Sequence, residues 1–340
     1  MQRTQSITRP KALEDLLDAP LIAKISRLDY TSKKIFAGKL KGERRSKKRG
    51  ESVEFADHRP YVEGDDLRHI DWNIFGRLDK LFLKLFLEEE DLALHIVIDC
   101  SASADCGQPN KFLFMQRLAM ALGYIGLVNL NRVTVSAMGG EIGRDEGTGG
   151  RRDEGEGGAG SASGSDPASL GRFVTPSLLA AVRDLRGRRR THDLSRFLCS
   201  LRPASSVPFT ECCRRVALTR RGKGVMVVMS DFFIKEGYET GLRMLLGRGY
   251  DLFLLQVLSP QELEPDIAGD LRLKDIEDGD QAEVTISAPL LKRYKANLGA
   301  YCDQLREFCA RREINLLTVR TDTAIDVLIL DYLRKRGLLQ

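Results

Sequence analysis

The stretch ALHIVIDCSAS, residues 93–103, decides the fold because its apolar half is followed directly by a polar half. Residues 93–98 form a short apolar run of the kind that predicts a buried strand. Asp99 follows at once, and Ser101 and Ser103 come after it at alternate positions. Because alternate residues of an extended segment point to the same side, we expect these three side chains to converge. The stretch therefore predicts a polar loop at the end of a core strand.

Further apolar runs of strand length follow along the chain, at residues 132–138, 225–229, 251–258 and 314–319. Helices are predicted between them. Residues 110–128 are apolar almost all round, and residues 290–309 repeat apolar side chains at helical spacing. Strands that alternate with helices indicate a mostly parallel sheet covered on both faces. We therefore predict an α/β fold with a doubly wound, mostly parallel sheet of the Rossmann type.

Residues 1–90 are predicted to form an N-terminal helical and β appendage, and residues 91–336 the sheet domain. The appendage has a helical pattern in two pieces over residues 11–37 and an alternating strand pattern over residues 80–88. Two insertions interrupt the sheet domain. Residues 139–171 contain 12 glycines and few apolar residues, which predicts a disordered loop. Residues 260–288 contain an Asp-Gly-Asp turn between alternating runs, which predicts a small hairpin.

Two acidic residues end two of the predicted strands. Asp99 follows residues 93–98, and Asp231 follows the run at 225–229 after one serine. In an open parallel sheet, ligands bind beyond the carboxyl ends of the strands. A hard cation such as Mg²⁺ prefers about six oxygen ligands, which two carboxylates, the hydroxyls of Ser101 and Ser103, and water can supply. The alternative is structural: one of the serines caps the next helix, and Asp99 binds backbone amides.

Composition and charge set only loose limits on function. The chain is 42% hydrophobic and 30% charged, as ordinary soluble proteins are. Its seven cysteines include no CxxC pair, which favours free thiols in a reducing cytoplasm. We expect no transmembrane helix, because no apolar run of about 18 residues occurs, and no secretory signal, because the N-terminal residues MQRTQSITRP contain no apolar core. Residues 39–49 carry seven basic side chains and one acidic, a run that could bind nucleic acid or an anionic surface. Because no aromatic residues lie within the run to stack on bases, a solvated loop is favoured.

A motif-rich segment precedes the strand at 93–98. It combines an EF-x-x-x-R-x-Y stretch, a Gly-Asp-Asp and an Arg-x-Ile-Asp-Trp, carried here by Glu54-Phe55, Arg59, Tyr61, Gly64-Asp65-Asp66, Arg68, Asp71 and Trp72. With the D-x-S-x-S loop, this segment resembles the MoxR-associated, von Willebrand factor A-like family known as domain of unknown function 58. The likeness is strongest over residues 49–90 and extends more weakly from about residue 12 to the C-terminus. We expect the segment to act structurally, as a polar network with Trp72 as an apolar anchor.

The resemblance implies a metal-ion-dependent adhesion site that holds Mg²⁺ or Mn²⁺. Ser101 and Ser103 would bind the metal directly, and Asp99 and Asp231 directly or through water. The fold also uses a threonine from a second loop, for which Thr210 is the first choice and Thr191 the second. The sequence departs from the pattern in two places, which implies weak or lost metal binding. Alanine stands at position 104 instead of methionine, and no Gly-Thr-Asp frames Thr210.

Three functional hypotheses follow. The first is a non-enzymatic protein-binding module that serves a client protein together with a MoxR-type AAA+ ATPase, the partner implied by the resemblance. The chain itself has no G-x-x-x-x-G-K-[ST] motif for ATP. The second is a metal-dependent phosphatase or nuclease, or a hydrolytic site at His58, His69 and Asp71, but neither arrangement shows a placed nucleophile with its base. The third is nucleic-acid binding through residues 39–49.

Overall fold

A computed structural model describes residues 8–31, 55–62, 67, 70–86, 92–142, 179–204, 208–219, 224–247, 249–276 and 280–340. The basic run 39–49, most of the glycine-rich insertion, and the hallmark residues Gly64, Asp65, Asp66 and Arg68 lie outside these residues, as does His69. The chain divides into two compact units. The larger comprises residues 1–38 and 92–340, and the smaller residues 39–91.

The larger unit is built on a six-stranded sheet. Its strands are β3 (Ala93–Asp99), β4 (Arg132–Met138), β6 (Leu179–Leu185), β8 (Gly224–Ser230), β9 (Tyr250–Leu258) and β12 (Asn315–Arg320). Their order is β12-β9-β8-β3-β4-β6, and all neighbours are parallel except β4 and β6. The structure thus confirms the mostly parallel α/β sheet and the five predicted strands. The antiparallel edge strand β6, which follows the glycine-rich insertion, was not predicted.

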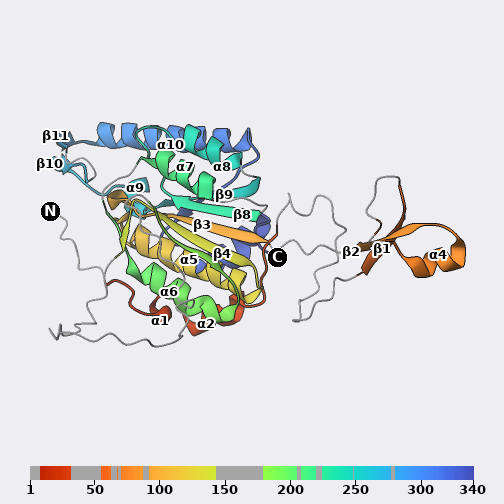
Figure 1. Cartoon of the computed structure of the whole chain (residues 1–340). Coiled ribbons are helices and arrows are strands. Elements are labelled where there is room, and N and C mark those ends of the chain that lie inside the picture. Colours follow the sequence, from red (N-terminus) through yellow and green to blue (C-terminus); the bar gives the residue numbers. More distant parts are fainter. Residues whose placement is uncertain are drawn as a thin grey trace, which may run out of the picture. The chain divides into compact units, whose positions relative to one another are not determined.

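The strands read as continuous apolar runs because both faces of the sheet are covered. Every residue of β8 and β9 is buried, which leaves no alternation of polar and apolar residues. On one face lie α5 (Lys111–Val128) and α6 (Thr191–Ser200), with α1 (Leu13–Leu16) and α2 (Ala19–Ile25) beyond them (Figure 1). On the other face lie α7 (Phe209–Thr219), α8 (Glu239–Leu246) and α10 (Ala288–Ala310) (Figure 1). Each face has its own cluster of buried apolar side chains.

Helix α5 is apolar almost all round because the sheet and other helices enclose it, and Arg117 is its one exposed side chain. It contacts β3 and β4 on one side and α1, α2 and α6 on the other. It is also the one helix among the described residues that is long and apolar enough to cross a membrane, but 83% of that window is buried inside the protein. Such burial is typical of a core helix.

The N-terminal helices belong to the sheet unit. Tyr30 pairs with Leu339 in an isolated bridge, and its hydroxyl donates to the Leu122 carbonyl of α5 at 2.7 Å. Helices α1 and α2 therefore belong to the same compact unit as the sheet, whereas the predicted boundary at residue 90 had grouped them with the hallmark segment. At the C-terminus, β12 is followed by α11 (Ile325–Val327) and η4 (Leu328–Leu333).

Short elements complete the larger unit. A hairpin of β10 (Gly269–Lys274) and β11 (Gln281–Ile286) follows α9 (Pro260–Leu263), as the Asp-Gly-Asp turn predicts. The glycine-rich insertion leaves the sheet after β4 through β5 (Glu141–Ile142), which pairs with β7 (Leu201–Arg202). Two 3₁₀ turns, η2 (Ala102–Ala104) and η3 (Arg188–Arg190), precede α5 and α6.

The smaller unit is an antiparallel pair of strands with one helix. Strand β1 (Phe55–Pro60) pairs with β2 (Phe82–Phe86), which lies within the predicted strand 80–88. Helix α4 (Trp72–Leu78) begins at Asp71, whose side chain accepts bonds from the amides of Asn73 and Ile74. Trp72 is 64% exposed and stacks edge-on against Phe75. Within this unit, Trp72 is therefore not the buried anchor that its size led us to expect.

Candidate functional site at the carboxyl edge of the sheet

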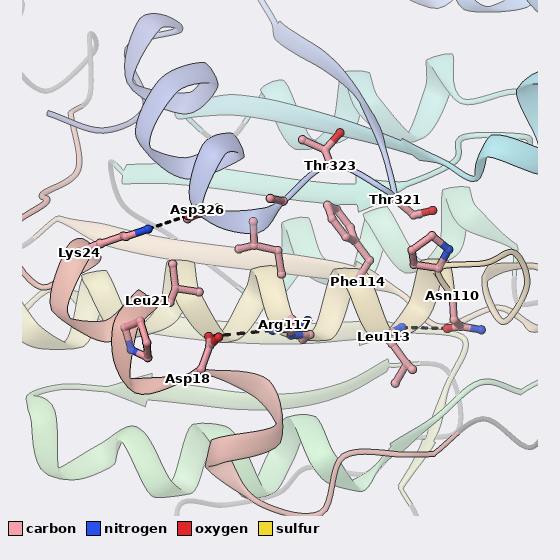
Figure 2. A pocket seen from close by; sticks show the side chains of 14 residues that line it. Asp18, Leu21, Lys24, Asn110, Leu113, Phe114, Arg117, Thr321, Thr323 and Asp326 are labelled. Carbon is pink, nitrogen blue, oxygen red and sulfur yellow. Dashed lines mark hydrogen bonds and ion pairs between the residues drawn. The ribbon is translucent and has the colours of Figure 1, made fainter.

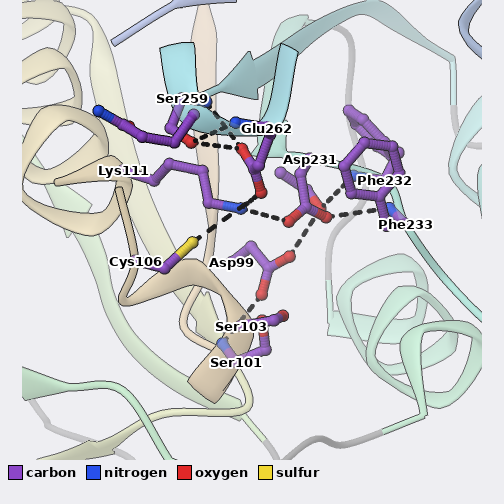
Figure 3. A network of polar contacts seen from close by, with 12 residues as sticks. Asp99, Ser101, Ser103, Cys106, Lys111, Asp231, Phe232, Phe233, Ser259 and Glu262 are labelled. Atoms are coloured by element: carbon purple, nitrogen blue, oxygen red, sulfur yellow. Dashed lines mark hydrogen bonds and ion pairs between the residues drawn. The ribbon is translucent and has the colours of Figure 1, made fainter. Parts of the chain in front are cut away.

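The two predicted acidic residues lie side by side because their strands are neighbours. Strand β3 is central and pairs in register with β8, so that Asp99 ends one strand beside the last residues of the other. The hydroxyl of Ser230 donates to Asp99 Oδ2 at 2.6 Å and thereby bonds the two strand ends together. Figure 3 shows Asp99 and Asp231 facing the same space. The structure therefore brings together the two carboxylates that the sequence placed 132 positions apart.

The D-x-S-x-S loop turns back on itself directly after β3. The amide of Ser101 donates to Asp99 Oδ1 at 2.9 Å, and the hydroxyls of Ser101 and Ser103 lie 3.0 Å apart. Neither serine caps α5. That role belongs to Asn110, whose Oδ1 accepts from the amide of Leu113 at 2.9 Å. The structural alternative is therefore right about the amide bond of Asp99, while the cap of α5 is Asn110 and not a serine.

A buried lysine completes the cluster, and sequence reasoning missed it. Lys111 is the first residue of α5 and is 1% exposed. Its Nζ lies 2.7 Å from Asp231 Oδ2 and 2.6 Å from Glu262 Oε1 (Figure 3). The other oxygen of Asp231 accepts from the amide of Phe233 at 2.9 Å. The signal that could have revealed Lys111 is its position, since it is the first residue of a helix that is apolar almost all round.

Glu262 is held in place from its own helix. The amide of Ser259 donates to Glu262 Oε2 at 2.7 Å, and the amide of Glu262 donates back to the Ser259 hydroxyl at 3.3 Å. These two bonds form a capping box at the start of α9. The loop before α5 packs closely on this start: Gly107 has φ +82°, and a Cβ there would lie 2.4 Å from the Cβ of Ser259. The cluster thus joins the carboxyl ends of β3, β8 and β9.

Burial and like charge make Asp99 an unusual carboxylate. Burial raises the pKa of Asp99, and the neighbouring charge of Asp231 raises it further, while the bonds from Ser230 and Ser101 partly oppose both effects. Burial by itself would lower the pKa of Lys111, but Asp231 and Glu262 outweigh it and hold that pKa above the usual range of lysine. One ammonium therefore serves two carboxylates, and Asp99 has no cation of its own in the cluster.

The donor atoms suit a hard divalent cation. Two carboxylates and two hydroxyls offer oxygen ligands only, the chemistry that Mg²⁺ and Mn²⁺ prefer. Among the described residues, no group of three or more His, Cys, Asp or Glu side chains could hold a metal ion. A cation here would therefore need the hydroxyls of Ser101 and Ser103 as well as Asp99 and Asp231. Lys111 is the feature that works against it, because it already neutralises Asp231.

The two candidate threonines have different surroundings. Thr210 lies in the first turn of α7, and the segment before that helix runs beside the loop, with Ala204 bridged to Ser101. The pKa of Cys212, two residues after Thr210, is raised to about 12 by burial first and by the charge of Asp99 second. The start of α7 therefore lies within electrostatic reach of Asp99. Among the described residues, no hydrogen bond joins Thr210 itself to the cluster. The position is thus near the site, without a direct bond.

Thr191 belongs to the opposite edge of the sheet. Strand β6 is antiparallel, so that it ends at Leu185 beside Val133, near the start of β4. Thr191 begins α6 after this end and donates its hydroxyl to the carbonyl of Arg188 at 2.6 Å. The runner-up threonine is therefore wrong as a second-loop ligand, because the direction of β6 places it away from Asp99.

The hallmark segment uses its polar residues to hold its own helix. His58 Nε2 lies 3.0 Å from Asp71 Oδ2, while Asp71 Oδ1 accepts the amide of Asn73 at 2.9 Å. Both carboxylate oxygens thus have structural partners, which supports the network interpretation over a hydrolytic site. Arg59 lies on β1 opposite Leu83 and is exposed, and Tyr61 follows that strand, its amide bonded to the Leu81 carbonyl.

A separate pocket of about 460 Å³ lies between α2, the start of α5 and the segment that follows β12 (Figure 2). Leu21 and Phe114 supply apolar walls, and the ion pair of Lys24 with Asp326 stands at its rim at 2.8 Å. Thr321 is 3% exposed and lines the pocket, and its hydroxyl has no partner among the described residues. None of the residues labelled in Figure 3 lines this pocket.

Comparison with known proteins places the chain in a family. The family described as "Protein of unknown function DUF58" matches residues 57–147 and 179–301, which together make up more than half of the chain. The chain belongs to this family. The match includes the smaller unit from residue 57, within β1, onward, as well as Asp99, Ser101, Ser103, Lys111 and Asp231.

The chain is also similar to uncharacterized proteins of Mycobacterium bovis and Mycobacterium tuberculosis. Each is 24% identical over 333 residues, which cover 96% of this chain and 93% of the relative. Among solved structures it is similar to the conserved hypothetical protein BatB of Bacteroides thetaiotaomicron, with 12% identity and a TM-score of 0.39. A second is an aerotolerance-related membrane protein of Bacteroides fragilis, with 14% identity and a TM-score of 0.38. Each alignment covers 72% of this chain and 98% of the other.

Proposed function

We propose that this DUF58 protein is a non-enzymatic protein-binding module of the von Willebrand factor A type, with a divalent cation held at Asp99, Ser101, Ser103 and Asp231. The observation that carries the proposal is the convergence of these oxygens at the carboxyl edge of the sheet, where the hydroxyls lie 3.0 Å apart beside Asp99. The strand order, with one antiparallel edge strand, supports the type of fold.

The bound cation would supply an open coordination position for an acidic side chain of a partner protein. Ser101 and Ser103 offer neutral oxygens, so their share of the coordination sphere would add no negative charge that repels an incoming carboxylate. Asp99 and Asp231 complete the set from the strand ends. Thr210, at the start of α7, is the nearest candidate for a second-loop ligand.

A binding role fits the residues better than a hydrolytic one. Enzymes that transfer phosphoryl groups through an aspartate at a strand end need a second carboxylate two residues later, and this chain has Ser101 there. Lys111 is committed to Asp231 and Glu262 at 2.7 and 2.6 Å. No particular observation favours a phosphatase or nuclease.

The proposed partner is inferred from the resemblance to MoxR-associated proteins. We propose a MoxR-type AAA+ ATPase in the cytoplasm, with which this chain assembles or remodels a client complex. Because the sequence contains no phosphate-binding loop of its own, the energy of ATP hydrolysis would come from that partner.

Titration calorimetry with Mn²⁺ and Mg²⁺ tests the proposal, on the wild type and on Asp99→Ala combined with Ser101→Ala. The same proteins are then assayed for capture of a purified MoxR-type ATPase encoded in the same genome. A matched control is Asp322→Ala with Thr323→Ala, an acid and a hydroxyl in the loop after β12. We expect metal-dependent capture that only the first double variant loses. Capture that persists without metal would show that the loop is structural and that docking occurs elsewhere.

A further inference from the structure

The proposed metal site contains a cation that the chain itself supplies. We propose that Lys111 is a tethered competitor of the divalent metal: its ammonium occupies Asp231 when no metal is bound and is held by Glu262 alone when the metal arrives. This inference rests on the proposed function and adds to it a built-in control of metal affinity.

The first argument is the occupancy of Asp231. Its Oδ2 accepts from Lys111 Nζ at 2.7 Å, and its Oδ1 from the amide of Phe233 at 2.9 Å. A metal ligated by this carboxylate at about 2.1 Å would stand roughly 5 Å from the ammonium, if the ammonium stayed in place. Two positive charges at that separation in a buried site repel each other strongly. The metal and the ammonium therefore compete for the same carboxylate.

The second argument is that the ammonium cannot withdraw to solvent. Lys111 is 1% exposed, and its ammonium lies beside Glu262 of α9 and Cys106 of the loop before α5 (Figure 3). A lysine that remained charged without a partner in this setting would be costly. An alternative counter-ion must therefore lie within reach of the same ammonium.

Glu262 provides that counter-ion. Its Oε1 lies 2.6 Å from Lys111 Nζ, and the capping box with Ser259 fixes its side chain independently of Asp231. The helix that carries Glu262 is also bound to the loop before α5, since Gln108 and Gln261 exchange hydrogen bonds of 3.0 and 2.9 Å. The ammonium can thus release Asp231 and keep a charged partner without any movement of α9.

Two neutral substitutions have opposite expected effects on metal affinity. Lys111→Gln removes the competing charge and keeps a hydrogen-bonding side chain, so metal should bind more tightly. Glu262→Gln keeps the capping box, because glutamine serves in it as glutamate does. It removes the alternative counter-ion, so the ammonium should hold Asp231 more firmly and the metal should bind more weakly.

The experiment is a Mn²⁺ titration by calorimetry on the full chain, with thermal unfolding measured with and without Mn²⁺. We expect Lys111→Gln to bind Mn²⁺ about tenfold more tightly or better, since one adjacent positive charge is lost. Glu262→Gln should bind severalfold more weakly than the wild type, and its result stands even if Lys111→Gln does not fold. Lys24→Gln, which removes the exposed partner of Asp326, is the control and should change nothing.

The outcomes separate this inference from the proposed function. Mn²⁺ affinity that is equal in all variants, or weaker in Lys111→Gln, would overturn the competition and leave the metal-dependent site standing. Binding by Lys111→Gln alone would support the competition and overturn metal-dependent capture in the native protein. If no variant bound Mn²⁺, both would be overturned.

Discussion

The strand-end cluster and the hallmark segment use the same local device with different results. Asp99, Asp231 and Asp71 each accept the amide of the residue two positions later, at 2.9 Å in every case. In the smaller unit that device simply starts a helix, and His58 satisfies the second oxygen. At the sheet edge two such carboxylates stand on adjacent strands and repel each other, and the one ammonium, that of Lys111, lies between Asp231 and Glu262. The difference teaches that the local motif is common to both places, and that only the second carboxylate gives the sheet edge the paired negative charge on which the proposed cation site depends.

The largest expected effect is the loss of the buried ammonium. Lys111→Ala should lower the free energy of unfolding of the sheet unit by about 3–5 kcal/mol, because it leaves Asp231 and Glu262 without their cation. Urea unfolding followed by far-ultraviolet circular dichroism measures it. Lys24→Ala, which breaks an exposed ion pair, should cost less than about 1 kcal/mol. Equal costs would show that the buried pair contributes no more than a surface one.

The second effect belongs to the hallmark segment. Asp71→Ala should destabilise the smaller unit by about 1–2 kcal/mol, because α4 loses its N-cap and His58 its partner. Trp72 is the only tryptophan, so its fluorescence during urea unfolding reports on this unit. Asp71→Asn keeps an oxygen for the amides and should cost under about 0.5 kcal/mol. If Asp71→Ala and Asp71→Asn are equally destabilised, the contact with His58 contributes more to the stability of the smaller unit than the N-cap does.

The third effect is a pH dependence that only the paired carboxylates should show. Because the pKa of Asp99 is raised on folding, the folded state binds its proton more tightly than the unfolded chain. The stability of the metal-free protein should therefore fall as pH rises from the ordinary aspartate pKa of about 3.9 to the raised value. Asp99→Asn should remove this dependence, as measured by urea unfolding in EDTA across that window. A wild-type profile parallel to that of Asp99→Asn would contradict a raised pKa of Asp99, which burial and then the charge of Asp231 cause.

The smallest effect on stability is expected at the loop. Ser103→Ala should change the free energy of unfolding by less than about 0.5 kcal/mol, because the serine caps no helix and lies at a partly exposed position. Ser103→Ala should nevertheless weaken Mn²⁺ binding. A loss of metal affinity without a loss of stability would identify the Ser103 hydroxyl as a metal ligand and not as a structural group. Ser200→Ala, at a hydroxyl bonded within α6, is the control for Mn²⁺ binding and should leave it unchanged.

The sequence by itself determined the parts of this protein that depend on local pattern. Apolar runs of strand length located β3, β4, β8, β9 and β12, and the polar residues that follow β3 and β8 located Asp99 and Asp231. Alternating runs around an Asp-Gly-Asp turn located the hairpin of β10 and β11. These features are predictable because periodicity and strand ends are properties of neighbouring residues.

Only the tertiary structure decided which side chains meet. Nothing in the sequence around Lys111 predicts its contacts with Asp231 and Glu262, which lie 120 and 151 residues away. The pairing of strands brings these residues together. The direction of β6 removed Thr191 from the site, although its sequence context resembled that of Thr210 as a helix start. The physical reason is that charge and burial act through space. The chemistry of Asp231 is therefore set by residues that sequence spacing does not connect to it.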